Sequence, residues 1–164
     1  MNNSLNVDVI INNKDDITNK FNNNKLSDEL NKYIYDECIG TPLNKEIIIN
    51  INTKFDLNKE DKNKLIDMIR SNYGYTIREE MLYIKYNNIK GVILLIIGII
   101  FILISNLISL TNIFWLQEVL LIISWVTIWE AVYNFIFVET KKKIKIKRLK
   151  KLTNCKIKFK SEMK

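Results

Sequence analysis

The feature that most limits what this chain can fold into is a run of 20 uncharged residues from Gly91 to Leu110, GVILLIIGIIFILISNLISL. A helix rises about 1.5 Å per residue, so this run spans about 30 Å, the thickness of one bilayer core. A second apolar run, Ile113 to Val138, is also long enough to cross a membrane. We therefore expect a transmembrane hairpin at residues 91–138, with spans at about 91–110 and 116–138. The alternative is a buried helical hairpin in the core of a soluble protein.

The distribution of basic residues orients this hairpin. The segment Lys141–Lys164 contains 12 Lys or Arg and one acid, Glu162, whereas the link Thr111–Glu118 has no Lys or Arg. Positively charged residues are retained on the cytoplasmic side of a membrane. Lys85 and Lys90 also precede the first span. We therefore expect a multi-pass protein of the bacterial cytoplasmic (inner) membrane, with both termini cytoplasmic and the link as a short external turn.

The basic segment KKKIKIKRLKK directly follows the second span. In isolation it is typical of a nucleic-acid-binding patch, but beside a membrane it meets anionic headgroups first, where each basic residue contributes about 1 kcal/mol. The chain offers no base-stacking platform or groove-reading helix for specific nucleic-acid recognition. We therefore expect membrane lipids with anionic headgroups as the partner, contacted by Lys141, Lys142, Lys143, Lys145, Lys147 and Arg148.

Three segments have the alternation of a strand. Apolar and polar side chains alternate with a period of two over residues 4–12, 45–55 and 154–160. The Asn-rich segment 12–24 is predicted to be a loop or to be partly ordered, because Asn and Asp favour turns over regular structure.

Helix signals lie between these strands. Ser27 is placed as the N-cap of a helix. This helix is predicted to end at the sequence GTP, which begins at Gly40. Asn58 is placed as the cap of a second, amphipathic helix, for which Gly74 is the predicted C-terminal stop. The segment YTIREEMLYIKYNNIKG, residues 75–91, places Ile77, Met81 and Ile84 at helical spacing and is predicted to be a third helix leading towards the first span. The part MLYIKY alone would also fit a strand.

These elements predict an α+β protein. Residues 1–90 are expected to form a small cytoplasmic domain of about three strands and two or three helices. The two-helix hairpin is inserted before the C-terminal strand. Residues 139–164 are expected to be a basic cytoplasmic tail whose strand returns to pair with an N-terminal strand, which would cover an otherwise exposed edge.

Two stretches, NKLIDMIRSNYGYTIREEMLYIKYNNIKG before the first span and LIISWVTIWEAVYNFIFVETKKKIKIKRLKKLTNCKIKF after it, resemble a group of small bacterial two-span integral membrane proteins of uncharacterised function. The resemblance covers roughly residues 26–160. Its most specific part is WVTIWEAVYN, followed by a basic segment and a final CKI strand. The resemblance implies an inner-membrane protein with cytoplasmic flanks, and it implies no catalytic residue.

Composition excludes several chemistries. The chain has no His, which excludes His-based acid–base catalysis, Ser-His-Asp triads and His metal sites. Its four Gly cannot assemble a Walker loop or a dinucleotide fingerprint. Cys38 and Cys155 lie in segments predicted to be cytoplasmic, where thiols are normally reduced, and two Cys alone do not close a zinc site. We interpret both as small core residues, with a redox role as the alternative, and we expect no enzyme activity, cofactor or metal site.

Glu130 is a lone carboxylate in the apolar aromatic stretch SWVTIWEAVYNF. Helical spacing places Thr127, Tyr133 and Asn134 on its side of the helix. When both spans are counted from their cytoplasmic ends, an antiparallel hairpin places Glu130 near Gly98, where the missing side chain permits close helix approach. The expected result is a narrow polar stripe.

This stripe has two interpretations. In the first, it lies deep in the membrane and faces an oligomer interface or an aqueous path, because an intramembrane carboxylate is costly in contact with lipid. In the second, the span is residues 113–132, and Glu130 lies in the cytoplasmic headgroup zone with Trp129 and Tyr133 as belt aromatics.

Two function classes follow. The first is a non-catalytic, membrane-anchored interaction or assembly module whose α+β domain binds a protein partner or a second copy of the chain. The second is a subunit of a small oligomeric channel or transport component with Glu130 in the pathway. Two spans cannot enclose a pore alone, so the second class requires a homo-oligomer.

Overall fold

The computed structural model of the chain describes residues 4–40, 42–108 and 113–161. The chain divides into two compact units. Met1–Arg78 together with Lys145–Lys164 forms the first, here called the α+β unit, and Glu79–Ile144 forms the second, here called the hairpin unit. The end of the predicted first span and the start of the predicted link, residues 109–112, lie outside the described residues, as do residues 162–164 of the predicted tail.

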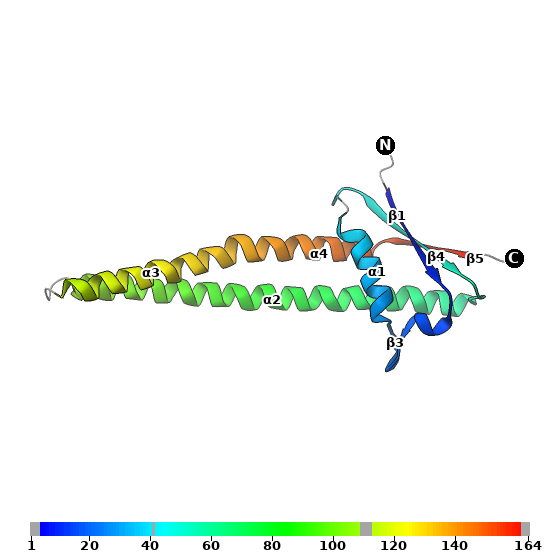
Figure 1. Cartoon of the computed structure of the whole chain (residues 1–164), viewed down its shortest axis with the longest axis horizontal. Coiled ribbons are helices and arrows are strands. Elements are labelled where there is room, and N and C mark those ends of the chain that lie inside the picture. The colour runs from blue at the N-terminus through cyan, green and yellow to red at the C-terminus, as the bar shows by residue number, and fades with distance from the viewer. Residues whose placement is uncertain (1–3, 41, 109–112, 162–164) are drawn as a thin grey trace. The chain divides into compact units, whose positions relative to one another are not determined.

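A parallel sheet underlies the α+β unit. It contains β1 (Ser4–Ile11), β4 (Glu46–Thr53) and β5 (Lys156–Ser161), in the order β1-β4-β5 (Figure 1). The strands predicted from the alternating pattern are therefore confirmed, and so is the return of the C-terminal strand to the N-terminal part of the chain. Parallel neighbours need long crossover connections. The sequence supplies one between β1 and β4 and a second, containing the hairpin, between β4 and β5.

The sheet buries one of its faces. On β1, Val7, Val9 and Ile11 are each 2 % exposed, and on β4, Ile49 and Ile51 are at most 1 % exposed. These side chains belong to one continuous apolar cluster. The opposite face is polar.

One row of that polar face crosses all three strands through the register Asp8, Asn50 and Lys158. Asn50 Nδ2 donates a hydrogen bond to Asp8 Oδ1 at 2.8 Å.

Helix α1 (Asp28–Ile39) adds its inner side to the same cluster. Ser27 Oγ accepts a hydrogen bond from the backbone N–H of Leu30 at 3.3 Å, which confirms the predicted N-cap. Ile34 is fully buried, and Cys38 is 3 % exposed. The helix ends at Gly40, as predicted.

Helix α2 (Lys59–Ile108) is 50 residues long. Its predicted cap is confirmed, since Asn58 Oδ1 accepts from the backbone N–H of Asp61 at 2.6 Å. The predicted stop at Gly74 is wrong. A glycine in a helix interior lowers helix stability by about 1 kcal/mol relative to alanine. This cost does not end a helix whose turns on both sides of the glycine pack against the core. Tyr73 is buried and Ile77 packs against the core, so the helix continues and contains the third predicted helix, residues 75–91.

The prediction of a loop over residues 12–24 is also wrong. This segment contains η1 (Lys14–Asp16), β2 (Thr18–Asn19) and the start of β3 (Asn22–Leu26), and β2 and β3 pair as an antiparallel hairpin. The side chains of Ile17 and Leu26 are only 7 % and 3 % exposed, and they pack the segment against the core.

The basic segment after the second predicted span is helical, which the sequence pattern did not predict. Helix α4 (Glu139–Thr153) buries Ile146, Leu149 and Leu152. Their spacing of three residues follows one side of a helix, while the lysines occupy the other positions.

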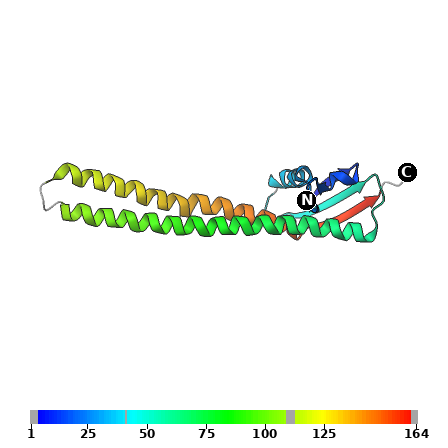
Figure 2. The same ribbon diagram turned by 90° about the horizontal axis from the view of Figure 1, so that it is seen from below.

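The hairpin unit pairs the C-terminal part of α2 with α3 (Phe114–Tyr133), which continues through a π-helical turn, η3 (Asn134–Val138), into α4. Figures 1 and 2 show α2 and α3 side by side. Residues 114–118, predicted to belong to the external turn, are helical. Both long helices have the length and composition to cross a membrane.

Candidate functional site

In the hairpin unit, the buried positions of α2 carry small or polar side chains, and those with a known neighbour face α3, η3 or α4. They are spaced by seven or four residues, which is the repeat of two helices that coil around each other. On the other side of the contact, Ser124 and Ala131 are fully buried. The buried positions of α2 in the hairpin unit are Glu80, Asn87, Gly91, Gly98 and Ser105.

The two glycines allow the helices to approach closely. A Cβ atom on Gly98 would lie 2.5 Å from Ile128 Cγ1 and 3.3 Å from the carbonyl oxygen of Ser124. A Cβ atom on Gly91 would lie 2.9 Å from the tip of the Phe135 ring. The neighbour of Gly98 is thus Ile128, and the structure does not bring Gly98 together with Glu130 as the sequence analysis expected.

Glu130 lies opposite Lys90 instead. Lys90 Nζ is 3.9 Å from Glu130 Oε1, and both side chains are about half exposed. Asn134 Nδ2 donates to the same carboxylate oxygen at 3.2 Å and to the Glu130 carbonyl at 2.9 Å. The structure therefore brings Glu130 and Asn134 together, as predicted, and adds a cation.

The remaining members of the predicted stripe are occupied elsewhere. Thr127 Oγ1 donates to the carbonyl of Ile123 in its own helix at 2.7 Å. The rings of Tyr133 and Phe137 lie 5.3 Å apart. Of the five predicted residues, Glu130 and Asn134 are thus the pair that the structure brings into direct contact.

The position of Glu130 along α3 explains why its neighbour on α2 is Lys90 and not Gly98. At about 1.5 Å per residue, Lys90 lies about 27 Å along α2 from Ile108, and Glu130 lies about 24 Å along α3 from Phe114. The two charges are therefore at nearly the same distance from the end of α2 and from the start of α3, respectively. Counting from Gly91 and Val138 placed Glu130 opposite Gly98, because it assumed that these two residues are level, whereas Gly91 lies opposite Phe135.

A second ion pair joins α2 to α4. Lys142 Nζ lies 2.7 Å from Glu80 Oε2 and 4.3 Å from the centre of the Tyr83 ring. Glu80 is 9 % exposed. Burial strengthens such a pair and makes the loss of one partner costly.

The basic residues predicted to contact headgroups differ in their surroundings. Lys142 pairs with Glu80, and Lys143 Nζ lies 2.6 Å from Glu139 Oε1. Lys145 and Arg148 are half-buried, whereas Lys141 and Lys147 are exposed.

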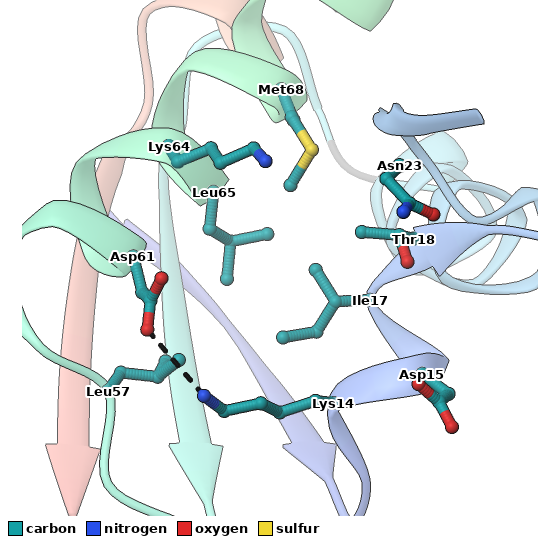
Figure 3. A pocket seen from close by; sticks show the side chains of 10 residues that line it. All are labelled: Lys14, Asp15, Ile17, Thr18, Asn23, Leu57, Asp61, Lys64, Leu65 and Met68. Atoms are coloured by element: carbon teal, nitrogen blue, oxygen red, sulfur yellow. Dashed lines mark ion pairs between the residues drawn. The ribbon is translucent and has the colours of Figure 1, made fainter.

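Figure 3 shows a pocket in the α+β unit that the sequence analysis missed. Its volume is about 270 Å³. It lies between the first turns of α2 and the η1–β3 segment, which continue the chain from the carboxyl ends of β4 and β1. Ligands of open parallel sheets bind outside these strand ends. A signal exists in principle, because parallel β1 and β4 place residues 14 and 57 at one end of the sheet, but the Asn-rich composition of segment 12–24 conceals its regular structure.

The pocket has an apolar floor and a charged rim. Ile17, Leu57, Leu65 and Met68 form the apolar part. On the rim, Lys14 Nζ lies 3.7 Å from Asp61 Oδ2 (Figure 3).

Further along the rim, Lys64 makes no ion pair within the described residues. Pockets for small molecules usually measure about 300–1,000 Å³. This one suits a single apolar side chain or a small amphipathic group, which the rim would orient by charge.

The two cysteines are buried beside the core helices. Burial raises the pKa of both thiols, to about 11 for Cys38 and about 11 for Cys155. A thiol with such a pKa remains protonated near neutral pH, and only the thiolate is nucleophilic. We expect neither cysteine of the folded protein to react with a maleimide at pH 7, and both to react after unfolding. Mass spectrometry of labelled protein measures this, and rapid labelling of folded protein would contradict the burial.

No group of three or more Cys, Asp or Glu residues is placed to hold a metal ion within residues 4–40, 42–108 and 113–161. Comparison of the chain with protein-family models, curated proteins and solved structures gave no match. The resemblance to small two-span membrane proteins therefore remains a prediction.

Proposed function

We propose that this chain is an integral protein of the bacterial inner membrane that acts as an anchored, non-catalytic interaction module. The hairpin crosses the bilayer twice, both termini are cytoplasmic, and the α+β unit binds a protein partner or a second copy of the chain. The basic residues of α4 contact anionic headgroups.

The direction of the side chains in the hairpin unit carries this proposal. Its large apolar side chains point outwards, as illustrated by Leu103 at 59 % and Val126 at 64 % exposure. In the most apolar 18-residue stretch of each long helix, only 17 % is buried. A soluble helical hairpin would place its large apolar side chains between the helices. Small residues between helices and apolar residues outside are typical of membrane helices.

Aromatic and charged side chains support the location of the boundaries. Tyr86 and Trp129 are exposed near the Lys90–Glu130 pair, and Trp115 is exposed at the other end of α3. Tyr and Trp concentrate at membrane–water interfaces. This arrangement favours the headgroup-zone interpretation of Glu130. It also weighs against a channel lined by Glu130, since a paired carboxylate attracts a permeating cation less strongly than a lone one.

The pocket of the α+β unit supports binding as the activity of the soluble part. An apolar floor with charged groups at its rim accepts an apolar side chain of a partner and fixes its direction. Its residues come from two segments that the fold brings together, so the pocket depends on the folded unit.

The first test is the mass of the protein extracted in nanodiscs, followed by ion flux in liposomes. Wild type is compared with Glu130→Gln and with Lys90→Gln, which removes the other charge of the same pair. We expect a monomer or small oligomer without flux in all three proteins. A defined ring whose flux changes with Glu130→Gln would replace the module by the channel alternative. Release of the protein from membranes by alkaline carbonate would contradict the anchoring itself.

A further inference from the structure

A group of lysines converges at the amino ends of β4 and β5. They line a cavity of about 290 Å³ formed by the segment before β4, the last turn of α4 and the start of β5. The polar side chains at this cavity are Lys45, Glu46, Lys150, Lys151, Asn154 and Lys156. Four cations and one carboxylate thus share one concave surface. All of them belong to the α+β unit.

Two contacts fix part of this arrangement. Lys151 Nζ donates to the carbonyl of Lys45 at 2.8 Å, which ties α4 to the start of β4. Lys156 Nζ lies 3.5 Å from Glu46 Oε2, but both side chains are 71 % exposed, so this pair is weak in water. Glu46 offsets one of the four positive charges, so the cavity keeps an excess of positive charge.

The helix end explains only some of these lysines. Lysines in the last turn of a helix interact favourably with its carbonyl end, which accounts for Lys150 and Lys151. It does not account for Lys45 and Lys156, which reach the same cavity from other segments of the chain. The positive charges of lysines that line one cavity repel one another, and an anion bound among them would offset this repulsion.

We propose that this cavity, here called the lysine pocket, binds a phosphate group. Lysine binds phosphate as a point charge, and three or four such charges suit a phosphate ester or a diphosphate. Two sources supply this chemistry: a free phosphorylated small molecule and the headgroup of an anionic lipid. The proposal is independent of the membrane proposal, because the pocket lies wholly within the α+β unit.

Calorimetric titration of the purified full-length protein with sodium pyrophosphate tests the first source. Native mass spectrometry with diheptanoyl phosphatidylglycerol, against phosphatidylcholine of the same chain length, tests the second. Each experiment compares wild type with Lys150→Gln and with Lys150→Gln/Lys151→Gln. The control is Lys54→Gln/Lys59→Gln, which removes the same charge from exposed positions outside the pocket.

We expect saturable binding by wild type and control, and at least about tenfold weaker binding by the double variant, since a tenfold change corresponds to about 1.4 kcal/mol. Lys150→Gln is included because Lys151 also holds a backbone carbonyl, and its loss alone could disturb folding. Pocket-dependent binding of pyrophosphate indicates a free phosphorylated ligand. Pocket-dependent binding of phosphatidylglycerol alone indicates a lipid headgroup. Absence of binding to both probes, or equal weakening in the control, overturns the proposal.

Discussion

The substitution Gly98→Leu is expected to separate the helices of the hairpin unit and to lower its free energy of unfolding by about 3 kcal/mol, the upper end of the usual cost of overpacking. Even a Cβ atom at this position would lie 2.5 Å from Ile128 Cγ1. That carbon is close to the backbone of α3, so the clash cannot be relieved by moving only the end of a flexible side chain. The helices must shift apart, and the contacts between the small residues of the two helices are then lost.

Thermal unfolding of the protein in detergent micelles, followed by circular dichroism, measures this effect. The matched control is Ile99→Leu, one residue further along α2, where the side chain is 45 % exposed and points away from α3. The variant Gly91→Ala should fall between them, because its neighbour is the tip of the Phe135 ring. Equal melting of Gly98→Leu and Ile99→Leu would show that the two helices do not pack at Gly98.

The substitution Ile49→Ala is expected to destabilise the α+β unit by about 2–5 kcal/mol, as large-to-small changes in a close-packed core do. Ile49 is fully buried in the central strand, between Val7 of β1 and Ile157 of β5. The loss combines the transfer of the removed methylenes to water with the cavity that they leave. Because domains of this size have a stability of about 5–15 kcal/mol, much of the unit's margin would disappear.

Limited proteolysis of the membrane-bound protein measures this loss without unfolding the hairpin. The control is Ile10→Ala on β1, where the side chain is 67 % exposed on the polar face of the sheet. We expect Ile49→Ala to be cleaved within the α+β unit at a rate at least about tenfold above that of the control, because cleavage follows the population of the open form. Similar rates for both variants would contradict the assigned core.

The elements that sequence patterns predicted correctly are those with strong local signals. The alternation of Ile47, Ile49 and Ile51 with Ile48 and Asn50 has the period of a strand, and β4 follows it. The caps at the start of α1 and α2 depend on side chains within three residues of the helix. Such signals do not require knowledge of the rest of the fold.

The incorrect predictions arose where tertiary contacts decide. Gly74 has the local chemistry of a helix stop, but the neighbouring turns of α2 pack on the sheet and extend the helix. The Asn-rich segment was taken as a loop, although Ile17 and Leu26 fasten it to the core. For α4, Leu149 and Leu152 have helical spacing, but the surrounding lysines concealed it.

Candidate sites were harder to predict than the fold. The partner of Glu130 depends on how the two helices are aligned, and the choice of Val138 as reference moved the expected partner from Lys90 to Gly98. Both pockets join segments far apart in the sequence. The positions of both pockets follow from the order of the parallel strands in the sheet. The positions of the strands in the sequence do not reveal that order.

The central claim is that the hairpin lies within a lipid bilayer, and maleimide labelling of Ile99→Cys in native membranes tests it most directly. The wild-type cysteines are buried and provide an unreactive background. The control is Lys141→Cys, at an exposed position of α4. In water, the side chain at residue 99 would be 45 % exposed and would react readily. We predict that Ile99→Cys stays unlabelled in opened membranes that label Lys141→Cys. Labelling of both at similar rates would contradict the membrane assignment.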